Sequence, residues 1–412
     1  MANPKLLLVM IDGVSADYLE TYPNRLPNLA SLAEDGYTVR RMRSPVPGTS
    51  MPGRASIVTG AGAEVHGIFG NRVLDGGAFV ASEVEHVRVP TVATLATRAG
   101  LDVACIGHAL VEPEDTSIYV PPCWLRGHGF TKVPSDGSVS TLLRVKDPRG
   151  RLASVPLPSY APETGGADAV SKITGMLIGD QLTIGAAAAL LKSQEPPDLL
   201  ITEINVTDTF QHDFGYGSDE AHFAMTFADS LVGICLDSLR RTSRLRDYAI
   251  CVVSDHGHGN INSSIFPGLI IPEKVWQAEG ATLHVLVADE QERQEIADRL
   301  SQYGAEPWSS DHLPIELREK IATFVAPEGY DFEDAPTGHP EDQPLGSPKY
   351  KSTHGFRPGK PADDRVCIIS GVGIPKGVAA EAGATRLAPT VSSILGLPLE
   401  IFPDRPLFER QY

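Results

Sequence analysis

Aspartate and histidine residues recur in this sequence directly after hydrophobic runs. Asp12 follows the run 6–11, and Asp255 with His256 follows the run 249–254. In an open α/β sheet the ligand crevice lies beyond the carboxyl ends of the strands, so we expect these side chains to converge on one edge. With one added hydroxyl there are seven candidate ligands for a pair of metal ions: Asp12, Ser50, Asp208, His212, Asp255, His256 and His354.

These motifs differ in how strongly they indicate a metal site. Asp208 and His212 are four residues apart, so on a helix they share one face and can bind one ion, although a surface helix with a solvated histidine explains them as well. Asp255 and His256 form a stronger signal, because a charged pair at the end of a buried strand has little structural purpose. His354 is a lone histidine in a loop and gains weight only from the other ligands.

The types of ligand narrow the choice of metal. Imidazole together with carboxylate is typical of zinc, with manganese or iron as weaker options, whereas calcium and magnesium prefer all-oxygen sets. Two ions about 3.5 to 4 Å apart can polarise a phosphoryl oxygen and lower the pKa of a bound hydroxyl. The sequence therefore predicts a hydrolase that uses two zinc ions.

Ser50 is the predicted nucleophile. Pro52 favours the first turn of a helix, which places Ser50 near a helix N-terminus, where free backbone N–H groups attract anions. Arg54 is expected to donate hydrogen bonds to the same oxyanion. Two alternatives stay open: a role for Ser50 as a helix N-cap, and the neighbouring Thr49 as a rival nucleophile by chemistry alone.

Composition excludes some classes of partner. The 412 residues carry a formal net charge of −17, and binding to a nucleic acid polymer depends on clustered Lys and Arg, so no such polymer is expected. The five cysteines are odd in number and scattered, which is typical of reduced core residues. The run 6–11 is too short for the core of a signal peptide, and no apolar stretch approaches the ~18 residues of a membrane helix. We expect a cytoplasmic protein with no membrane partner.

Hydrophobic runs alternate with helical patterns along the chain. The runs are dense in Val, Ile, Leu or Cys and cover 5–11, 101–107, 197–205, 247–254 and 365–371. Helices are expected at 27–35, 91–98, 170–191, 220–241 and 388–395. Continuous apolar runs suit parallel strands that are buried on both faces. The predicted fold is a doubly wound, mostly parallel α/β sheet sandwiched by helices.

Two stretches, 109–168 and 259–352, interrupt this alternation. We expect them to form an inserted cap that sets substrate specificity. The catalytic core would then consist of 1–108, 169–258 and 353–412.

Other polar residues have weaker claims to the site. His258 is expected to line the pocket or, as the slightly preferred interpretation, to replace a packing residue. Asn205, Thr207 and Gln211 flank the ligands and are candidates for orienting them. Three residues of the first insertion could meet a distal charge on the substrate, but surface solvation explains them better: Arg126, His128 and Lys132.

Taken together, these motifs resemble the alkaline phosphatase superfamily. The nearest branch looks like type I phosphodiesterase/nucleotide pyrophosphatase and phosphonoacetate hydrolase. The segments that carry the resemblance are Ile11-Asp12-Gly13, Ser50-Met51-Pro52, Ile57-Val58-Thr59-Gly60, His66-Gly67-Ile68, Asp208-x-x-x-His212, Asp255-His256-Gly257 and Thr353-His354-Gly355.

The resemblance implies a ligand set for each zinc ion. One ion would be held by Asp208, His212 and His354. The other would be held by Asp12, Asp255 and His256, with Ser50 bridging toward it. The resemblance also implies that the serine attacks phosphorus to give a phospho-serine intermediate, which water then hydrolyses.

Two departures from the family pattern bear on the substrate. The phosphodiesterase and phosphonoacetate branches usually carry Thr where this chain has Ser50, and a phosphoryl-contacting Asn where it has Gly53. An arginine at position 54 on the phosphoryl group would favour a doubly charged end group, a monoester or phosphonate. The pattern Ser-x-Pro-x-Arg also resembles the sulfatase signature, in which Cys or Ser becomes formylglycine, although His212 and His354 argue against a sulfatase.

We therefore expect a zinc-dependent hydrolase of small phosphorus esters or phosphonates, acting on a small anionic substrate. The alternatives are a nucleotide-type phosphodiesterase or pyrophosphatase, a formylglycine-type sulfatase, and a non-catalytic, metal-stabilised binding protein. The sequence is compatible with a homo-oligomer but does not indicate one.

Overall fold

A computed structural model describes three stretches of the chain: 4–124, 144–158 and 169–409. Part of the first predicted insertion, including Arg126, His128 and Lys132, lies outside the described residues.

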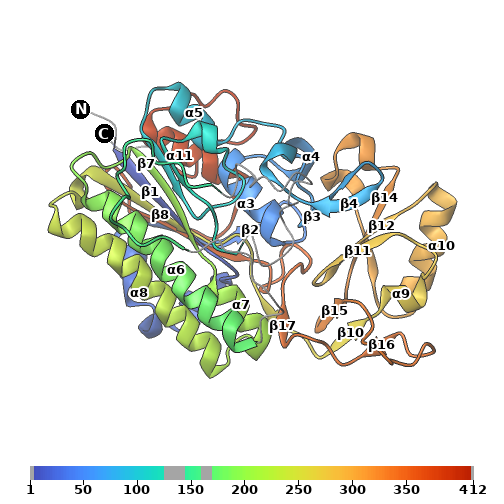
Figure 1. Ribbon diagram of the computed structural model, residues 1–412. Helices are drawn as coiled ribbons and strands as arrows, with labels where there is room; N and C mark the ends of the chain where they lie inside the picture. The colour runs from blue at the N-terminus through green and yellow to red at the C-terminus, as the bar shows by residue number, and fades with distance from the viewer. Residues whose placement is uncertain (1–3, 125–143, 159–168, 410–412) are drawn as a thin grey trace.

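A nine-stranded sheet forms the centre of the structure (Figure 1). Its strands follow the order β19-β2-β18-β8-β1-β7-β5-β6, with β20 beside β2. Every pairing is parallel except those of β18. The bounds are β1 (Lys5–Ile11), β2 (Tyr37–Arg43), β5 (Val103–Ile106), β6 (Ile118–Val120), β7 (Leu199–Ile204), β8 (Tyr248–Val253), β18 (Arg365–Gly371), β19 (Gly377–Ala379) and β20 (Ala382–Gly383).

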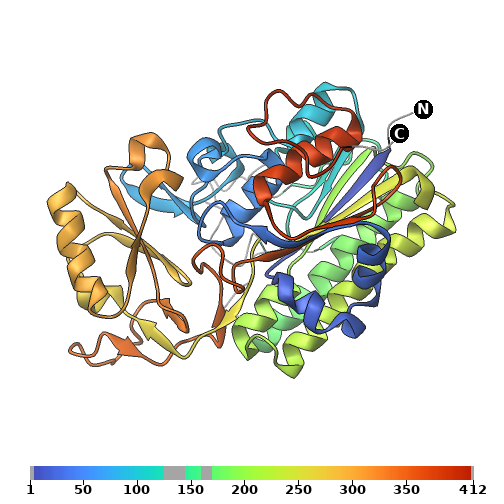
Figure 2. The same cartoon turned by 180° about the vertical axis from the view of Figure 1, so that it is seen from behind.

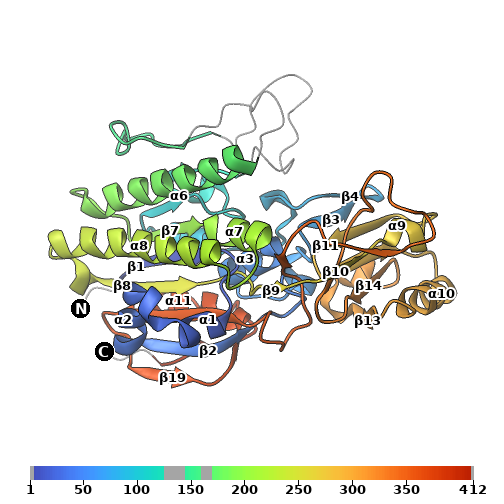
Figure 3. The same cartoon turned by 90° about the horizontal axis from the view of Figure 1, so that it is seen from below.

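Helices cover both faces of this sheet, as Figures 2 and 3 show. Alternate residues of β1 enter two separate cores: Leu7 packs with one set of helices and Leu8 with the other. The first set is α2 (Pro27–Asp35), α6 (Ala169–Lys192) and α8 (Asp219–Arg241). The second set is α3 (Ser50–Thr59), α5 (Val92–Arg98) and α11 (Leu387–Leu395). The predicted sandwich is confirmed.

One segment of α6, Ile173–Lys192, is long and apolar enough to cross a membrane by length and composition. The sequence interpretation had found no stretch of that length. Half of the segment is buried, and Ile184, Leu190 and Leu191 belong to the core on one face of the sheet. The core helix of a soluble protein passes the same test, so packing accounts for the apolar composition.

The region 259–352 forms a second lobe beside the sheet (Figure 1). Its four-stranded antiparallel sheet has the order β11-β12-β14-β13, and Leu283, Ile296 and Phe324 belong to a hydrophobic core of its own. A smaller sheet has the order β15-β10-β16. The bounds are β10 (Ser263–Ile265), α9 (Pro267–Ile270), β11 (Trp276–Glu279), β12 (Thr282–Leu286), α10 (Glu290–Ser301), β13 (Glu306–Trp308), β14 (Ile321–Val325), β15 (Tyr330–Phe332) and β16 (Leu345–Gly346).

The first insertion differs from the prediction in one respect. Its strand β6 pairs with β5 at the edge of the main sheet, so 118–120 belong to the core sheet and not to the cap. A strand of three residues is too short to stand out as a hydrophobic run, which explains why the sequence boundary fell before it. The wider division into core and cap stays a prediction.

Helix α3 packs directly against the end of β8, and Gly53 makes this contact possible. A Cβ atom at Gly53 would lie 2.1 Å from the carbonyl oxygen of Asp255 and 3.0 Å from its Cβ. No side chain fits there unless the backbone moves. The absence of an Asn at this position is therefore a packing requirement of this chain.

We expect Gly53→Ala to destabilise the protein by about 1–3 kcal/mol, the usual cost of overpacking a core. The matched control is Gly185→Ala in α6, where an added methyl meets no atom within 4 Å. That change should stabilise by up to about 1 kcal/mol, because alanine is the better helix former. Chemical denaturation measures both, and equal stabilities for the two variants would contradict the close packing.

Candidate metal centre and nucleophile

The seven predicted site residues lie together at the carboxyl edge of the main sheet. Asp12 follows β1, while Asp255 and His256 follow β8. Asp208 and His212 lie on α7 (Val206–Phe214), which begins two residues after β7, so the expected helical spacing is confirmed.

His354 reaches the site through a pairing that the sequence did not show. It follows β17 (Ser352–Thr353), which is antiparallel to β9 (Gly259–Asn260), a continuation of the segment after β8. The next residue, Gly355, donates its N–H to the carbonyl oxygen of Gly48 at 2.8 Å. These two contacts hold the loop beside both β8 and the segment before Ser50.

The donor atoms form three groups, and within each group every donor lies within 4.8 Å of the others. One group, Asp12 with Asp255 and His256, is the set expected for one ion. The remaining groups both contain Asp208, first with His212 and His258, then with His256 and His354. The predicted set of Asp208, His212 and His354 stays a prediction.

The histidine rings are oriented by carbonyl oxygens, which can only accept. Nδ1 of His212 donates to the Ser352 carbonyl at 2.9 Å, and Nδ1 of His256 donates to the Gly257 carbonyl at 2.8 Å. Each neutral ring then turns the lone pair of Nε2 toward a carboxylate. The distances are 3.3 Å from His212 Nε2 to Asp208 Oδ1 and 3.2 Å from His256 Nε2 to Asp12 Oδ1. Two acceptors this close need a cation between them, either a proton or a metal ion.

The pKa values describe the protein without metal. Burial alone would lower the pKa of His256, but the neighbouring Asp255 and Asp12 raise it to about 9. Burial also opposes protonation of His212, whose pKa the adjacent Asp208 nevertheless raises. The carboxylates thus attract positive charge to the place where the Nε2 atoms point.

Two buried polar atoms at this site have no hydrogen bond to any described residue: Asp12 Oδ1 and His354 Nδ1. Buried polar atoms are nearly always paired, so this concentration needs an explanation. The donors are the carboxylates and imidazoles that zinc prefers, and their close grouping fits metal ions.

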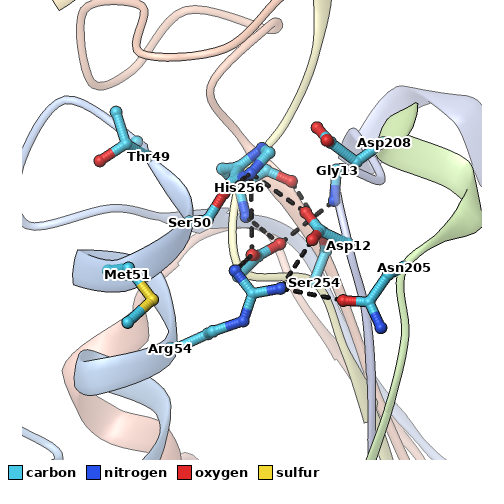
Figure 4. Close-up of polar contacts among 12 residues, drawn as sticks. Asp12, Gly13, Thr49, Ser50, Met51, Arg54, Asn205, Asp208, Ser254 and His256 are labelled. Atoms are coloured by element: carbon cyan, nitrogen blue, oxygen red, sulfur yellow. Dashed lines mark hydrogen bonds and ion pairs between the residues drawn. The ribbon is translucent and has the colours of Figure 1, made fainter. Parts of the chain in front are cut away.

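Ser50 presents the hydroxyl of the site. It is the first residue of α3, and its Oγ lies 3.1 Å from Nε2 of His256 (Figure 4). Thr49 is the N-cap of α3, so the interpretation of Ser50 as the cap is wrong. The Thr49 hydroxyl donates to Glu279 at 3.2 Å, and Figure 4 shows it turned away from Asp12 and His256.

Arg54 lies beneath the ligands and is only 1% exposed. Its Nη2 contacts Asp12 Oδ2 at 2.6 Å, and its Nη1 contacts Asp255 Oδ2 at 2.9 Å. Nε lies 3.3 Å from Glu203, and Nη2 also donates to Asn205 at 3.1 Å (Figure 4). All three guanidinium nitrogens of Arg54 therefore contact buried acceptors of the protein. Arg54, which was expected to contact the phosphoryl group, instead orients the two candidate metal ligands Asp12 and Asp255.

Glu203 and Trp124 belong to this network, and sequence reasoning missed both. The indole Nε1 of Trp124 donates to Glu203 at 2.6 Å, and the ring centroid lies 5.1 Å from the guanidinium of Arg54. Glu203 is fully buried within β7. The sequence did carry a signal for this network, because a glutamate inside a run of buried strand residues needs a buried partner.

Thr207 and Gln211, which were expected to orient the ligands, donate hydrogen bonds to the segment after β1. Thr207 Oγ1 donates to the carbonyl of Asp12 at 2.5 Å, and Gln211 Nε2 donates to the carbonyl of Gly13 at 2.7 Å. These bonds tie α7 to the segment after β1, and so hold Asp208 beside Asp12.

A small cavity of about 190 Å³ opens onto this site. A larger cavity of about 630 Å³ adjoins it, and the two share the lining residues Asn71, His212, Tyr350 and His354. The larger cavity extends to the second lobe, where Trp276, Glu279 and Phe332 line it. A small cavity at the candidate ligands is thus joined to a larger one that extends toward the second lobe.

Comparison with known proteins gives the family. The family described as type I phosphodiesterase / nucleotide pyrophosphatase matches residues 6–355. A bis(5'-adenosyl)-triphosphatase of Xenopus laevis is 39% identical over 74 residues, 18% of this chain and 16% of the relative. A venom phosphodiesterase of Macrovipera lebetinus is 25% identical over 259 residues, 62% of this chain and 26% of the relative. The matches thus span about a quarter or less of these relatives' lengths.

Solved structures show the same fold. Murine ectonucleotide pyrophosphatase/phosphodiesterase 5, as an inactive variant in complex with AMP, has a TM-score of 0.67 at 15% identity and covers 96% of both chains. The human protein has a TM-score of 0.65 at 14% identity, over 99% of this chain and 97% of that one. Since the family match extends from β1 to the segment that carries His354, this chain belongs to the type I phosphodiesterase/nucleotide pyrophosphatase family.

Proposed function

We propose that this chain hydrolyses phosphoric diesters with the help of two zinc ions, through a covalent intermediate on Ser50. The observation that carries the proposal is the position of the Ser50 hydroxyl. It stands at the start of α3, 3.1 Å from His256 Nε2, beside the candidate metal ligands, where Asp12 Oδ1 and His354 Nδ1 have no hydrogen bond to a described residue. A structural serine would not need such surroundings.

The donor set supports zinc. Asp12, Asp255 and His256 would hold one ion, and Asp208, with His212 and His354 as the expected partners, would hold the other. When bound, the ions lower the pKa of the serine hydroxyl and neutralise charge that develops on the phosphoryl oxygens.

The chemistry of this chain's own residues then follows in two steps. The Ser50 hydroxyl loses its proton to water, and Oγ forms a bond to phosphorus while the ester P–O bond breaks. The leaving oxygen takes up a proton from water and departs as an alcohol. A second water then attacks phosphorus and breaks the Oγ–P bond; one of its protons goes to Oγ, which restores the hydroxyl and releases a phosphate monoester. The positive end of the α3 helix dipole favours the anionic phosphoryl group during both steps.

The position of Arg54 changes the expected substrate charge. A guanidinium on the phosphoryl group would have favoured a doubly charged monoester or phosphonate. Because Arg54 is directed to Asp12, Asp255 and Asn205, that argument no longer applies. Arg54 therefore gives no reason to prefer a dianion over a singly charged diester, the substrate type that the family description names.

The adjoining cavity supports a nucleotide-type substrate. Its volume of about 630 Å³ lies within the range of small-molecule sites and leaves room for a group as large as a nucleoside. The murine neighbour in complex with AMP and the adenosyl-triphosphatase relative carry nucleotides in their names. The cytoplasmic location stays a prediction, whereas several relatives are named as ectonucleotide or venom enzymes.

We expect Ser50→Ala to abolish turnover of an aryl phosphate diester while metal content is retained, because the nucleophile is removed and the carboxylate and imidazole donors stay. Ser50→Thr keeps a hydroxyl and should retain part of the activity. Thr49→Val is the matched control and should keep turnover. Diester turnover that survives in Ser50→Ala would refute the covalent mechanism.

Chelation should abolish the turnover, and added zinc should restore it, because the ions are proposed to activate the serine. One zinc-loaded preparation is then given aryl diester, monoester, phosphonate and sulfate substrates. We expect the highest kcat/KM for the diester. A clear preference for the monoester would contradict the proposed diester substrate, and turnover of sulfate alone would favour the sulfatase alternative.

We expect Arg54→Met to destabilise the metal-free protein by about 3–5 kcal/mol, the cost of removing one partner from a buried ionic network. It leaves Asp12, Asp255 and Glu203 without a buried cation. The double variant with Glu203→Gln should recover part of this loss. Unfolding and metal titration measure the effects. Unchanged stability and metal binding, with only turnover lost, would instead favour the original prediction that Arg54 binds substrate.

A further inference from the structure

We propose that His258 is a ligand of the metal ion at Asp208, in addition to His212. The proposal rests on the metal dependence proposed above and concerns a residue beyond the family-like motif, which ends at Gly257. His258 is 1% exposed, and its Nε2 lies 3.2 Å from Asp208 Oδ1.

The hydrogen bonds of Ser352 fix the tautomer of His258. The Ser352 hydroxyl has one hydrogen, and it donates this to the carbonyl oxygen of Gln211 at 2.6 Å. The same Oγ lies 2.9 Å from Nδ1 of His258. Because that hydroxyl hydrogen is already used, Nδ1 of His258 must be the donor, and the neutral ring presents the lone pair of Nε2 on its other side.

This lone pair faces an acceptor. Asp208 Oδ1 lies 3.2 Å from Nε2 of His258 and 3.3 Å from Nε2 of His212, whose own Nδ1 donates to a carbonyl. A proton on one ring satisfies one of these contacts only. Protons on both rings would place two buried cations with ring centroids 4.7 Å apart, at a cost in repulsion. One metal ion among the three donors satisfies all of them.

The surroundings hold His258 in this position. Its N–H donates to Ser15 Oγ at 2.8 Å, and Ser15 Oγ donates to the His258 carbonyl at 3.1 Å. Gly13 has φ +70°, and a Cβ atom there would lie 3.2 Å from both Asp208 Oδ1 and His258 Cδ2. The bare backbone of Gly13 thus lets Asp208 and His258 approach each other.

With His258 as a ligand, the types of donor atom around the ion at Asp208 are defined. The donors Asp208, His212 and His258 lie within 4.8 Å of one another and supply two imidazole nitrogens for one carboxylate oxygen. A nitrogen-rich site favours zinc or cobalt over manganese and magnesium, which prefer oxygen.

Cobalt titration with visible absorption tests the assignment, because the d–d bands report the ligands. Wild-type protein should bind two Co²⁺ per chain. In His258→Gln, affinity at one site should fall by more than about 100-fold, beyond the range for groups that only orient a ligand, and its bands should shift. His284→Gln is the matched control, since His284 is an equally buried histidine that bonds Thr323 in the second lobe. It should leave both sites unchanged.

Ser352→Ala removes the acceptor of His258 Nδ1, together with the hydrogen bond to the Gln211 carbonyl, and should weaken the same site by about 10–100-fold without changing the type of ligand. Two tight ions with unchanged bands in His258→Gln would overturn the inference and leave the proposed function standing. A wild-type chain that binds no ion would overturn the proposed function itself.

A crystal structure of zinc-loaded wild-type protein decides the matter even if the variants fail to fold. The inference requires His258 Nε2 at about 2.0–2.1 Å from an ion, and a zinc site without that contact would overturn it.

Discussion

The structure depends on keeping several carboxylates close together at the carboxyl edge of the sheet. Asp12 and Asp255 follow neighbouring parallel strands, and their side chains would repel each other without positive charge. Arg54 supplies that charge from below, through contacts of 2.6 and 2.9 Å. On the opposite side, atoms such as Asp12 Oδ1 have no hydrogen-bond partner among the described residues. A permanent cation thus holds one side of the pair, and on the other side Asp12 Oδ1 belongs to the candidate metal site.

Because Arg54 must reach these carboxylates, the sequence of α3 has to meet several requirements at once. Ser50 must start the helix at the metal site, and Gly53 must let the helix touch the carbonyl of Asp255. Arg54 must then reach under the same carboxylates. Three positions within one and a half helical turns thus set the proposed nucleophile, the packing distance and the charge balance. Glu203 contacts Nε of the same arginine, and Trp124 donates a hydrogen bond to Glu203 and lies beside the guanidinium.

The sequence predicted those parts of the fold that depend on local pattern. The buried runs became β1, β7, β8 and β18, and the helix expected at 27–35 has the same bounds in the structure. The Asp208 and His212 spacing was also correct, because helical periodicity is a local property. The family assignment was confirmed as well, because it depends on short motifs that a sequence displays directly.

Contacts between distant segments could not be predicted in this way. Arg54 points to Glu203 and not to solvent because β7 places a buried glutamate beside it, 149 residues along the chain. His258 lies against Asp208 because Gly13, from a third segment, leaves space for both. The strand β6 was missed because three residues carry too little pattern.

The central claim is a covalent intermediate on Ser50, and the stereochemical course at phosphorus tests it most directly. The substrate is a chiral phosphorothioate diester hydrolysed in ¹⁸O-labelled water, with the configuration of the product determined by nuclear magnetic resonance. Attack by Ser50 followed by attack of water inverts phosphorus twice, so the account predicts net retention. Net inversion would mean that water attacks the substrate directly and would contradict the role given to Ser50.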